Sequence, residues 1–197
     1  MYYTSRNQML TLEANIIQNI NILKAISALS SNSTEKVCFI GSTSVYGQLL
    51  ESAKTTESPI TEKAYNLDDL SQGNYGYSVA KSILPYFAKT ASLEMGLKCI
   101  TLVPSGICGF SPFVNRNQSY RSRHTFLIAI ILKIIESSFH YSAPSLELPG
   151  SGSELRQFDF SIDLAKAILF SLESYKEIQP LNIGCSSQYS IRNYVSI

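Results

Sequence analysis

The feature that most constrains the fold is an ordered series of strand, helix and strand in the middle of the chain. The apolar run Lys36–Ile40 has the composition of a buried strand, and Ser42 follows it directly. A helix is expected from about Asn74 to Met95, and a second apolar strand follows at Lys98–Pro104. This order places the Ser42 hydroxyl at the carboxyl end of the first strand.

The pentad Tyr77-Ser78-Val79-Ala80-Lys81 places a phenol and an ammonium group four residues apart, on one face of that helix. A nearby cation and the positive end of a helix both favour the phenolate, so the pKa of Tyr77 is expected to fall below about 10. Such a phenol would exchange protons near neutral pH while Ser42 holds a substrate oxygen. The pattern predicts proton exchange at a carbinol or carbonyl. By itself the same spacing also occurs in ordinary surface pairs on helices.

Several ordered motifs resemble the extended short-chain dehydrogenase/reductase superfamily, which contains the nucleotide-sugar epimerases, dehydratases and reductases. Within it, the chain is most similar to the group of GDP-L-fucose synthases, and the resemblance runs from about Ala14 to Val195. The motifs that carry it lie at residues 41–47, 74–81, 150–158, 161–165, 181–184 and 190–191.

The resemblance implies an α/β fold with a partial Rossmann-type doubly wound sheet. Residues 1–110 would form part of the NAD(P)-binding domain, residues 111–156 part of the substrate-binding domain, and residues 157–197 a return to the sheet and the start of a C-terminal substrate segment. None of the ten glycines forms a Gly-x-Gly-x-x-Gly or Gly-x-x-Gly-x-x-Gly loop, which in this family precedes the first helix. We therefore expect an N-terminally truncated member that lacks the first three strands.

Three residues match the catalytic group of the family. Ser42 matches its catalytic hydroxyl, Tyr77 its acid–base tyrosine, and Lys81 the lysine that also holds the nicotinamide ribose. The alternative for Ser42 is a strand-end serine that caps its own backbone. The residues that match cofactor-lining positions are Ile40, Gly41, Ser42, Thr43, Tyr77, Lys81, Pro104 and Ile107.

Further candidates concern the substrate. His124 matches an acid–base histidine used for epimerisation, with an ordinary polar histidine at a helix start as the alternative. Ser44 stands where that step needs a thiol, and a hydroxyl is a poor proton relay, so reduction or plain 4-epimerisation is favoured. Arg156 matches the arginine that binds the nucleotide-sugar diphosphate, a role suited to a guanidinium fork, although a surface arginine is the alternative. Gly106 replaces an asparagine that usually contacts the sugar nucleotide.

Three functions remain open at this point. The first is an NADP(H)-dependent nucleotide-sugar reductase or epimerase that exchanges hydride at a hexose C4. The second is a UDP-sugar 4-epimerase or 4,6-dehydratase, which would use NAD and would fit the run at residues 41–47 equally well. The third is a non-catalytic remnant without a dinucleotide site.

Composition and charge limit the binding partners and the cellular location that we expect. The 197 residues carry a net charge of +1 without a basic cluster, which gives no indication of nucleic-acid or membrane binding. The four cysteines show no metal-ligand spacing and are expected to be reduced thiols of a cytoplasmic protein. The most apolar stretch, at residues 126–135, is about half the ~20 residues that cross a bilayer. Relatives commonly form homodimers through helices that correspond here to residues 12–29 and 78–95.

An exposed strand edge is a further expectation. Without the first three strands, the strand at residues 37–40 would have an unpaired apolar edge, and such edges pair with other chains. The chain is therefore predicted to self-associate or fold poorly by itself, and to bind a nicotinamide dinucleotide weakly.

Overall fold

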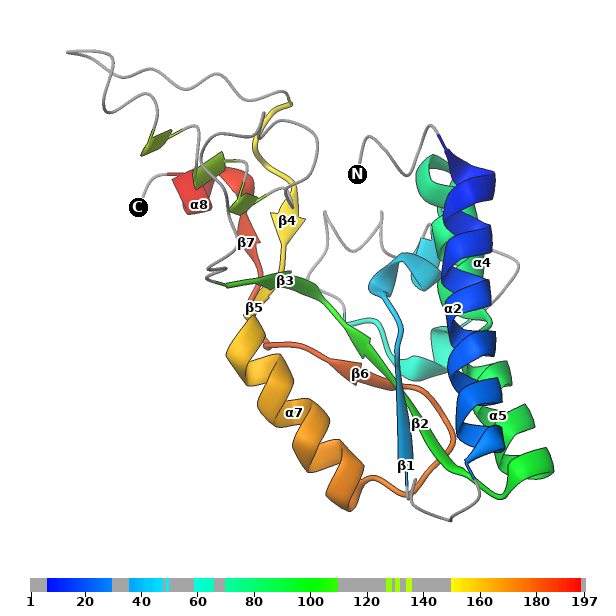
Figure 1. Cartoon of the computed structure of the whole chain (residues 1–197). Coiled ribbons are helices and arrows are strands. Elements are labelled where there is room, and N and C mark those ends of the chain that lie inside the picture. Colours follow the sequence, from blue (N-terminus) through cyan, green and yellow to red (C-terminus); the bar gives the residue numbers. More distant parts are fainter. Residues whose placement is uncertain are drawn as a thin grey trace.

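Figure 1 shows the computed structural model, which describes residues 7–29, 36–47, 49, 59–65, 70–109, 127–128, 130–131, 134–135 and 150–195. At its centre is a parallel sheet of three strands in the order β1-β2-β6, formed by β1 (Lys36–Ile40), β2 (Lys98–Pro104) and β6 (Leu181–Ile183). Ile40 pairs with Leu102, and Pro104 pairs with Ile183. The carboxyl ends of the three strands therefore meet at one edge of the sheet.

Helices cover both faces of this sheet (Figure 1). On one side lie α2 (Gln8–Ala28), α4 (Tyr75–Ser82) and α5 (Leu84–Met95), with α2 packed along α4 and α5 against β1 and β2. On the other side lies α7 (Ser161–Ser174). This arrangement of helices on both faces of a parallel sheet confirms the expected Rossmann-type α/β fold.

The expected single helix from residue 74 to Met95 is interrupted, which corrects the sequence interpretation. α4 ends at Ser82, Ile83 has φ −85° and ψ −7°, and α5 then begins at Leu84. Pro85 explains the break because it has no N–H to donate to the preceding turn and its ring obstructs a continuous helix.

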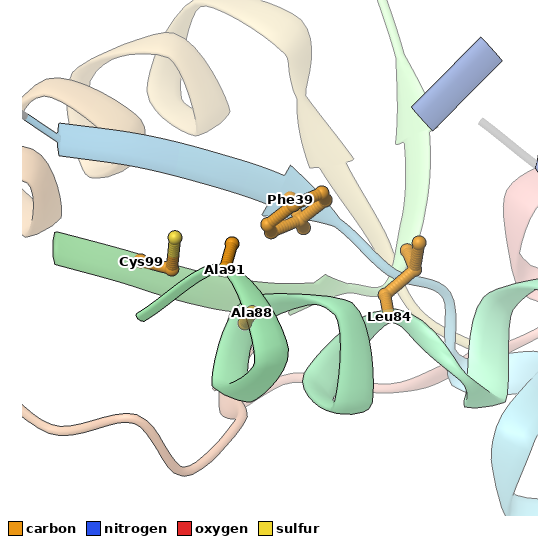
Figure 2. Packing of buried hydrophobic residues seen from close by; sticks show 5 residues of the cluster. All are labelled: Phe39, Leu84, Ala88, Ala91 and Cys99. Atoms are coloured by element: carbon orange, nitrogen blue, oxygen red, sulfur yellow. The ribbon is translucent and has the colours of Figure 1, made fainter. Parts of the chain in front are cut away.

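The core between the sheet and α5 consists of small and aliphatic side chains around one aromatic ring. Figure 2 shows Phe39 of β1 facing the helix. Every residue of this buried cluster has an exposed fraction of 6% or less. This packing fixes the position of α5, and with it the end of α4, relative to the carboxyl edge of the sheet. The cluster comprises Phe39, Leu84, Ala88, Ala91 and Cys99.

Two smaller strand pairs extend the fold beyond the central sheet (Figure 1). The pair β3 (Gly106–Cys108) and β5 (Phe158–Phe160) is parallel, whereas β4 (Leu155–Arg156) and β7 (Tyr189–Ser190) are antiparallel. β7 leads into the short helix α8 (Ile191–Val195). The chain after Pro104 therefore continues into a further short strand, β3.

Short connections complete the carboxyl edge of the sheet. Three 3-10 turns, η1 (Thr43–Tyr46), η2 (Glu62–Ala64) and η3 (Gln72–Asn74), lie between β1 and α4 in the chain. Ser161 is the first residue of α7, and Phe160 occupies the cap position without a side-chain hydrogen bond.

The expected substrate-binding part lies mostly outside the described residues. In the apolar stretch at residues 126–135, the described residues 127–128, 130–131 and 134–135 are helical. The division of the chain at residues 110 and 156 stays a prediction.

β1 lies at one edge of the described sheet, with β2 as its neighbour and β6 at the other edge, so the strand at residues 36–40 has the unpaired side that was expected. In the described part of the chain, no helix is both long and apolar enough to span a bilayer.

Candidate active site

The turn after β1 presents Ser42 at the carboxyl edge of the sheet. The Gly41 N–H donates to Leu102 O at 2.7 Å, so the chain stays against β2 beyond the end of β1. A Cβ atom at position 41 would lie 3.2 Å from Leu102 O and 3.3 Å from a methyl carbon of Val103, which is why a glycine suits this position. Ser42 is extended, and its Oγ accepts the Ser44 N–H at 3.3 Å at the start of η1.

Tyr77 and Lys81 lie one turn apart on α4 and meet Ser42 from the helix side. A side-chain hydrogen bond joins Tyr77 to Ser42. Lys81 Nζ lies 5.6 Å from the centre of the Tyr77 ring and donates to Ile40 O at 2.9 Å. The structure thus brings together the three residues predicted to be catalytic, beside the last residue of β1.

The electrostatics of the pair correct one expectation. Burial raises the pKa of Tyr77 above its ordinary value, and the hydrogen bond with Ser42 opposes this only in part. Burial also lowers the pKa of Lys81. The expectation that Lys81 and the helix start would lower the pKa of Tyr77 was wrong for this structure, because desolvation of the phenolate is the larger effect. Tyr77 is therefore a neutral phenol at neutral pH.

Apart from Tyr77 and Lys81 on α4, the predicted cofactor-lining residues lie on or just after the strands β1, β2 and β3. Thr43 begins η1, Pro104 ends β2, and Ile107 lies on β3, where it pairs with Asp159 of β5. In parallel α/β sheets this edge is where ligands bind.

The substrate candidates are more dispersed. Ser44 Oγ is buried and has no hydrogen-bond partner among the described residues. Arg156 lies on β4, in a separate strand pair, and its Nη1 donates to Leu155 O at 2.9 Å. The structure does not place Arg156 in contact with Ser42, Tyr77 or Lys81. His124 lies outside the described residues.

Within the described residues, no cluster of His, Cys, Asp and Glu side chains could hold a metal ion.

Sequence analysis missed a hydrogen-bonded group beside the site. Tyr46 donates its hydroxyl to Asn182 Oδ1 at 2.5 Å. The Asn182 N–H donates to Glu62 Oε1 at 2.9 Å, and its Nδ2 donates to Ile60 O at 3.1 Å. These bonds fasten the segment at residues 59–65 to β6. Tyr46 belongs to the motif at residues 41–47, but Asn182 and Glu62 are 120 residues apart, and no local pattern links them.

A parallel α/β sheet with a hydroxyl, a phenol and an amine grouped at its carboxyl edge defines a protein of the Rossmann type. The chain belongs to the NAD-dependent epimerase/dehydratase family, whose model matches residues 4–184.

Curated relatives are similar at low identity. A probable GDP-L-fucose synthase 1 of Oryza sativa subsp. japonica is 23% identical over 94% of this chain and 52% of its own length. A GDP-L-fucose synthase of Sinorhizobium fredii is 27% identical over 93% of this chain and 52% of its own length. The chain thus spans about half the length of these relatives.

Solved structures share the fold. A GDP-mannoheptose C4 reductase from Campylobacter jejuni with NADP bound has a TM-score of 0.76 and 19% identity, over 98% of this chain and 63% of its own. A GDP-L-fucose synthetase from Naegleria fowleri bound to NADP gives 0.72 and 21%, over 96% and 57%. A UDP-N-acetylglucosamine 4-epimerase from Methanobrevibacter ruminantium gives 0.65 and 20%, over 92% and 50%.

Proposed function

We propose that this chain carries the proton-transfer site of a nucleotide-sugar oxidoreductase that uses NADP(H), or NAD, to exchange hydride at a hexose C4. The observation that carries the proposal is the grouping of Ser42, Tyr77 and Lys81 beside the end of β1. Family membership and the GDP-sugar enzymes among its relatives support the substrate class.

The residues present fit the nicotinamide end of a dinucleotide. Lys81 Nζ and the Tyr77 phenol supply donors for ribose hydroxyls at the carboxyl edge of the sheet. When bound, the nicotinamide supplies or accepts the hydride. The sequence contains no Gly-x-Gly-x-x-Gly loop for the pyrophosphate.

The protonation state of Tyr77 suits the direction of reduction. A neutral phenol can donate its Oη proton to the carbonyl oxygen as hydride adds to the carbon, which turns the carbonyl into a hydroxyl. Ser42, which is hydrogen-bonded to Tyr77, holds the same oxygen. The Lys81 ammonium stabilises the phenolate that is left, until solvent returns the proton.

The remaining candidates extend this proposal to the sugar nucleotide. We assign Ser44, whose buried Oγ has no hydrogen-bond partner among the described residues, to a bond with a sugar hydroxyl; a serine there disfavours epimerisation through a thiol. We assign Arg156 to the diphosphate and His124 to acid–base chemistry, as the resemblance implies.

We also propose a cytoplasmic homodimer, and exposed Leu10, Ile17 and Ile22 on α2 support the proposed dimer face.

The test is a reduction assay with the purified protein, a GDP-4-keto-sugar and NADPH. Tyr77→Phe should lower kcat about 10²–10⁴-fold because it removes the proton donor and leaves the ring. Tyr86→Phe is the matched control, since Tyr86 is 56% exposed on α5 and should keep the wild-type rate. Equal rates for Tyr77→Phe and wild type would contradict the proposal.

The alternatives give different outcomes in the same experiment. A UDP-sugar 4-epimerase or 4,6-dehydratase would retain NAD⁺ through purification and convert its substrate without net consumption of NADPH. Its support is the similarity of fold to the archaeal 4-epimerase. A folded wild type that turns over none of these substrates would indicate a non-catalytic remnant.

A further inference from the structure

The carbonyl of Lys81 lacks its ordinary helical partner. In a continuous α-helix it would accept the N–H of the residue four positions later, which here is Pro85 and has no N–H. The Ile83 N–H points toward both the Val79 and the Lys81 carbonyls, as at a helix end. The residue proposed to stabilise the phenolate thus stands in the last turn of a helix that a proline interrupts.

A side chain from outside the helix takes the place of the missing donor. The Tyr65 hydroxyl donates to Lys81 O at 3.1 Å. Burial, with Tyr46 and Tyr86 nearby, raises the pKa of Tyr65, so its phenol keeps the proton that this bond requires. A side-chain hydrogen bond to a carbonyl that lacks its donor four residues later is one way in which a helix end is stabilised.

Tyr65 is itself held in place from several sides. Its N–H donates to Glu62 O at 3.0 Å, and its ring packs edge-to-face on Tyr46 with centroids 6.0 Å apart. The segment that carries it is fastened to β6 through Asn182, which binds the Glu62 carboxylate and Ile60 O. These contacts therefore hold the Tyr65 hydroxyl in a fixed position at the carboxyl edge of the sheet.

Lys81 is consequently fixed at both of its ends. Its Nζ donates to Ile40 O at 2.9 Å on β1, and its carbonyl accepts from Tyr65. Tyr77 stands one turn earlier on the same helix, so the end of α4 cannot shift without moving the amine relative to the phenol.

We propose that Tyr65 is a positioning residue for the site: its hydroxyl replaces the backbone donor that Pro85 removes and so fixes the turn from which Lys81 reaches Ile40 O and Tyr77. The effect on catalysis rests on the function proposed above, whereas the effect on Lys81 is a property of the fold.

The test is a cycle of four proteins: wild type, Tyr65→Phe, Pro85→Ala and the double variant. In the two proteins that carry Pro85→Ala, the new backbone N–H can donate to Lys81 O, which makes the Tyr65 hydroxyl redundant. The readout is the titration of Lys81, followed by ¹³C NMR of reductively methylated lysines and assigned with Lys81→Arg. Tyr189→Phe serves as the control for loss of a tyrosine hydroxyl on the exposed surface, because Tyr189 lies in the separate β4–β7 strand pair.

The expected result is conditional on the proline. With Pro85 present, Tyr65→Phe should loosen the turn, admit water to Lys81 and move its titration up toward the ordinary value, because burial is what lowers it. The melting temperature should fall by about 2–4 °C, as for one lost hydrogen bond. In the Pro85→Ala background, Tyr65→Phe should leave the Lys81 titration and the melting temperature unchanged. In the reduction assay, kcat should change only in the variant whose Lys81 titration changes.

Two results would overturn the proposal. One is an unchanged Lys81 titration in Tyr65→Phe with Pro85 present; the other is an equal shift in both backgrounds, which would assign the effect to ring packing. If Tyr65→Phe does not fold, recovery of the fold in the double variant supports the proposal and its absence contradicts it. Failure of the proposed function would give a different result. The Lys81 titrations would still differ among the four proteins as expected, and only the change in kcat would be absent.

Discussion

At the scale of single residues, burial controls the acid–base state of the tyrosines beside the site. Tyr46 is 2% exposed, and burial raises its pKa from 10 to about 12, with the nearby Glu62 carboxylate adding to the rise. Tyr65 and Tyr77 shift in the same direction for the same main reason. The site therefore holds neutral phenols that donate hydrogen bonds, as Tyr46 and Tyr65 do.

These shifts predict how stability depends on pH. Because the pKa of Tyr46 is higher in the folded chain, the unfolded chain loses its proton first as pH rises above 10. The contribution of Tyr46 is thus fully present below pH 10 and is lost as pH rises through about 12. Urea unfolding between about pH 8 and about pH 12 should show a steep loss for wild type and a shallower one for Tyr46→Phe. An equally steep loss in Tyr46→Phe and wild type would contradict this prediction.

At the scale of elements, the contact between α2 and α4 sets where the Tyr77 helix begins. The Gly76 N–H donates to Gln8 Oε1 at 3.0 Å, which satisfies one of the free donors of the first turn of α4. The backbones approach so closely that a Cβ at position 76 would lie 2.3 Å from Gln8 O. Only a glycine permits this approach.

A matched pair of glycine substitutions tests the contact. Gly76→Ala should lower the free energy of unfolding by about 1–3 kcal/mol, because two backbones must move apart. Gly73 lies three residues earlier in η3, and a Cβ atom added there would meet no atom within 4 Å. Gly73→Ala should therefore change the free energy of unfolding little. Chemical denaturation of the two variants measures the difference. Equal stabilities would mean that α2 and α4 are not packed as closely as the structure shows.

At the scale of the whole molecule, the described chain presents an open sheet edge and apolar helix surfaces. β1 pairs only with β2 among the described strands. On the other side of the sheet, Ile162, Leu169 and Phe170 of α7 are each more than 60% exposed. An unpaired strand edge is a template for pairing with another chain.

The chain by itself is therefore predicted to self-associate and to bind NADPH weakly, the latter because its sequence holds no pyrophosphate loop. Sedimentation velocity over a range of concentrations should show oligomers. Phe170→Lys should leave them intact if pairing uses the backbone of β1, and should dissolve them if the α7 face is responsible. A stable monomer that binds NADPH tightly would contradict both parts of the prediction.

Local patterns were sufficient to predict the principal elements and the helix face that Tyr77 and Lys81 share. Apolar runs predicted the strands Lys36–Ile40 and Lys98–Pro104, and the i, i+4 spacing predicted that Tyr77 and Lys81 share a helix face. The break at Ile83 was also predictable, because Pro85 is a local signal.

Tertiary structure alone decided the state of the site. The direction of the Tyr77 shift depends on desolvation, which sums over everything packed around the phenol and is not contained in the spacing to Lys81. Likewise, the bond from Tyr65 to the Lys81 carbonyl and the bond from Asn182 to Glu62 join segments that no sequence period relates. Sequence determined which groups the site contains, because residue type and periodicity are local; the fold determined their partners and charges, because burial and hydrogen bonding depend on the whole packed chain.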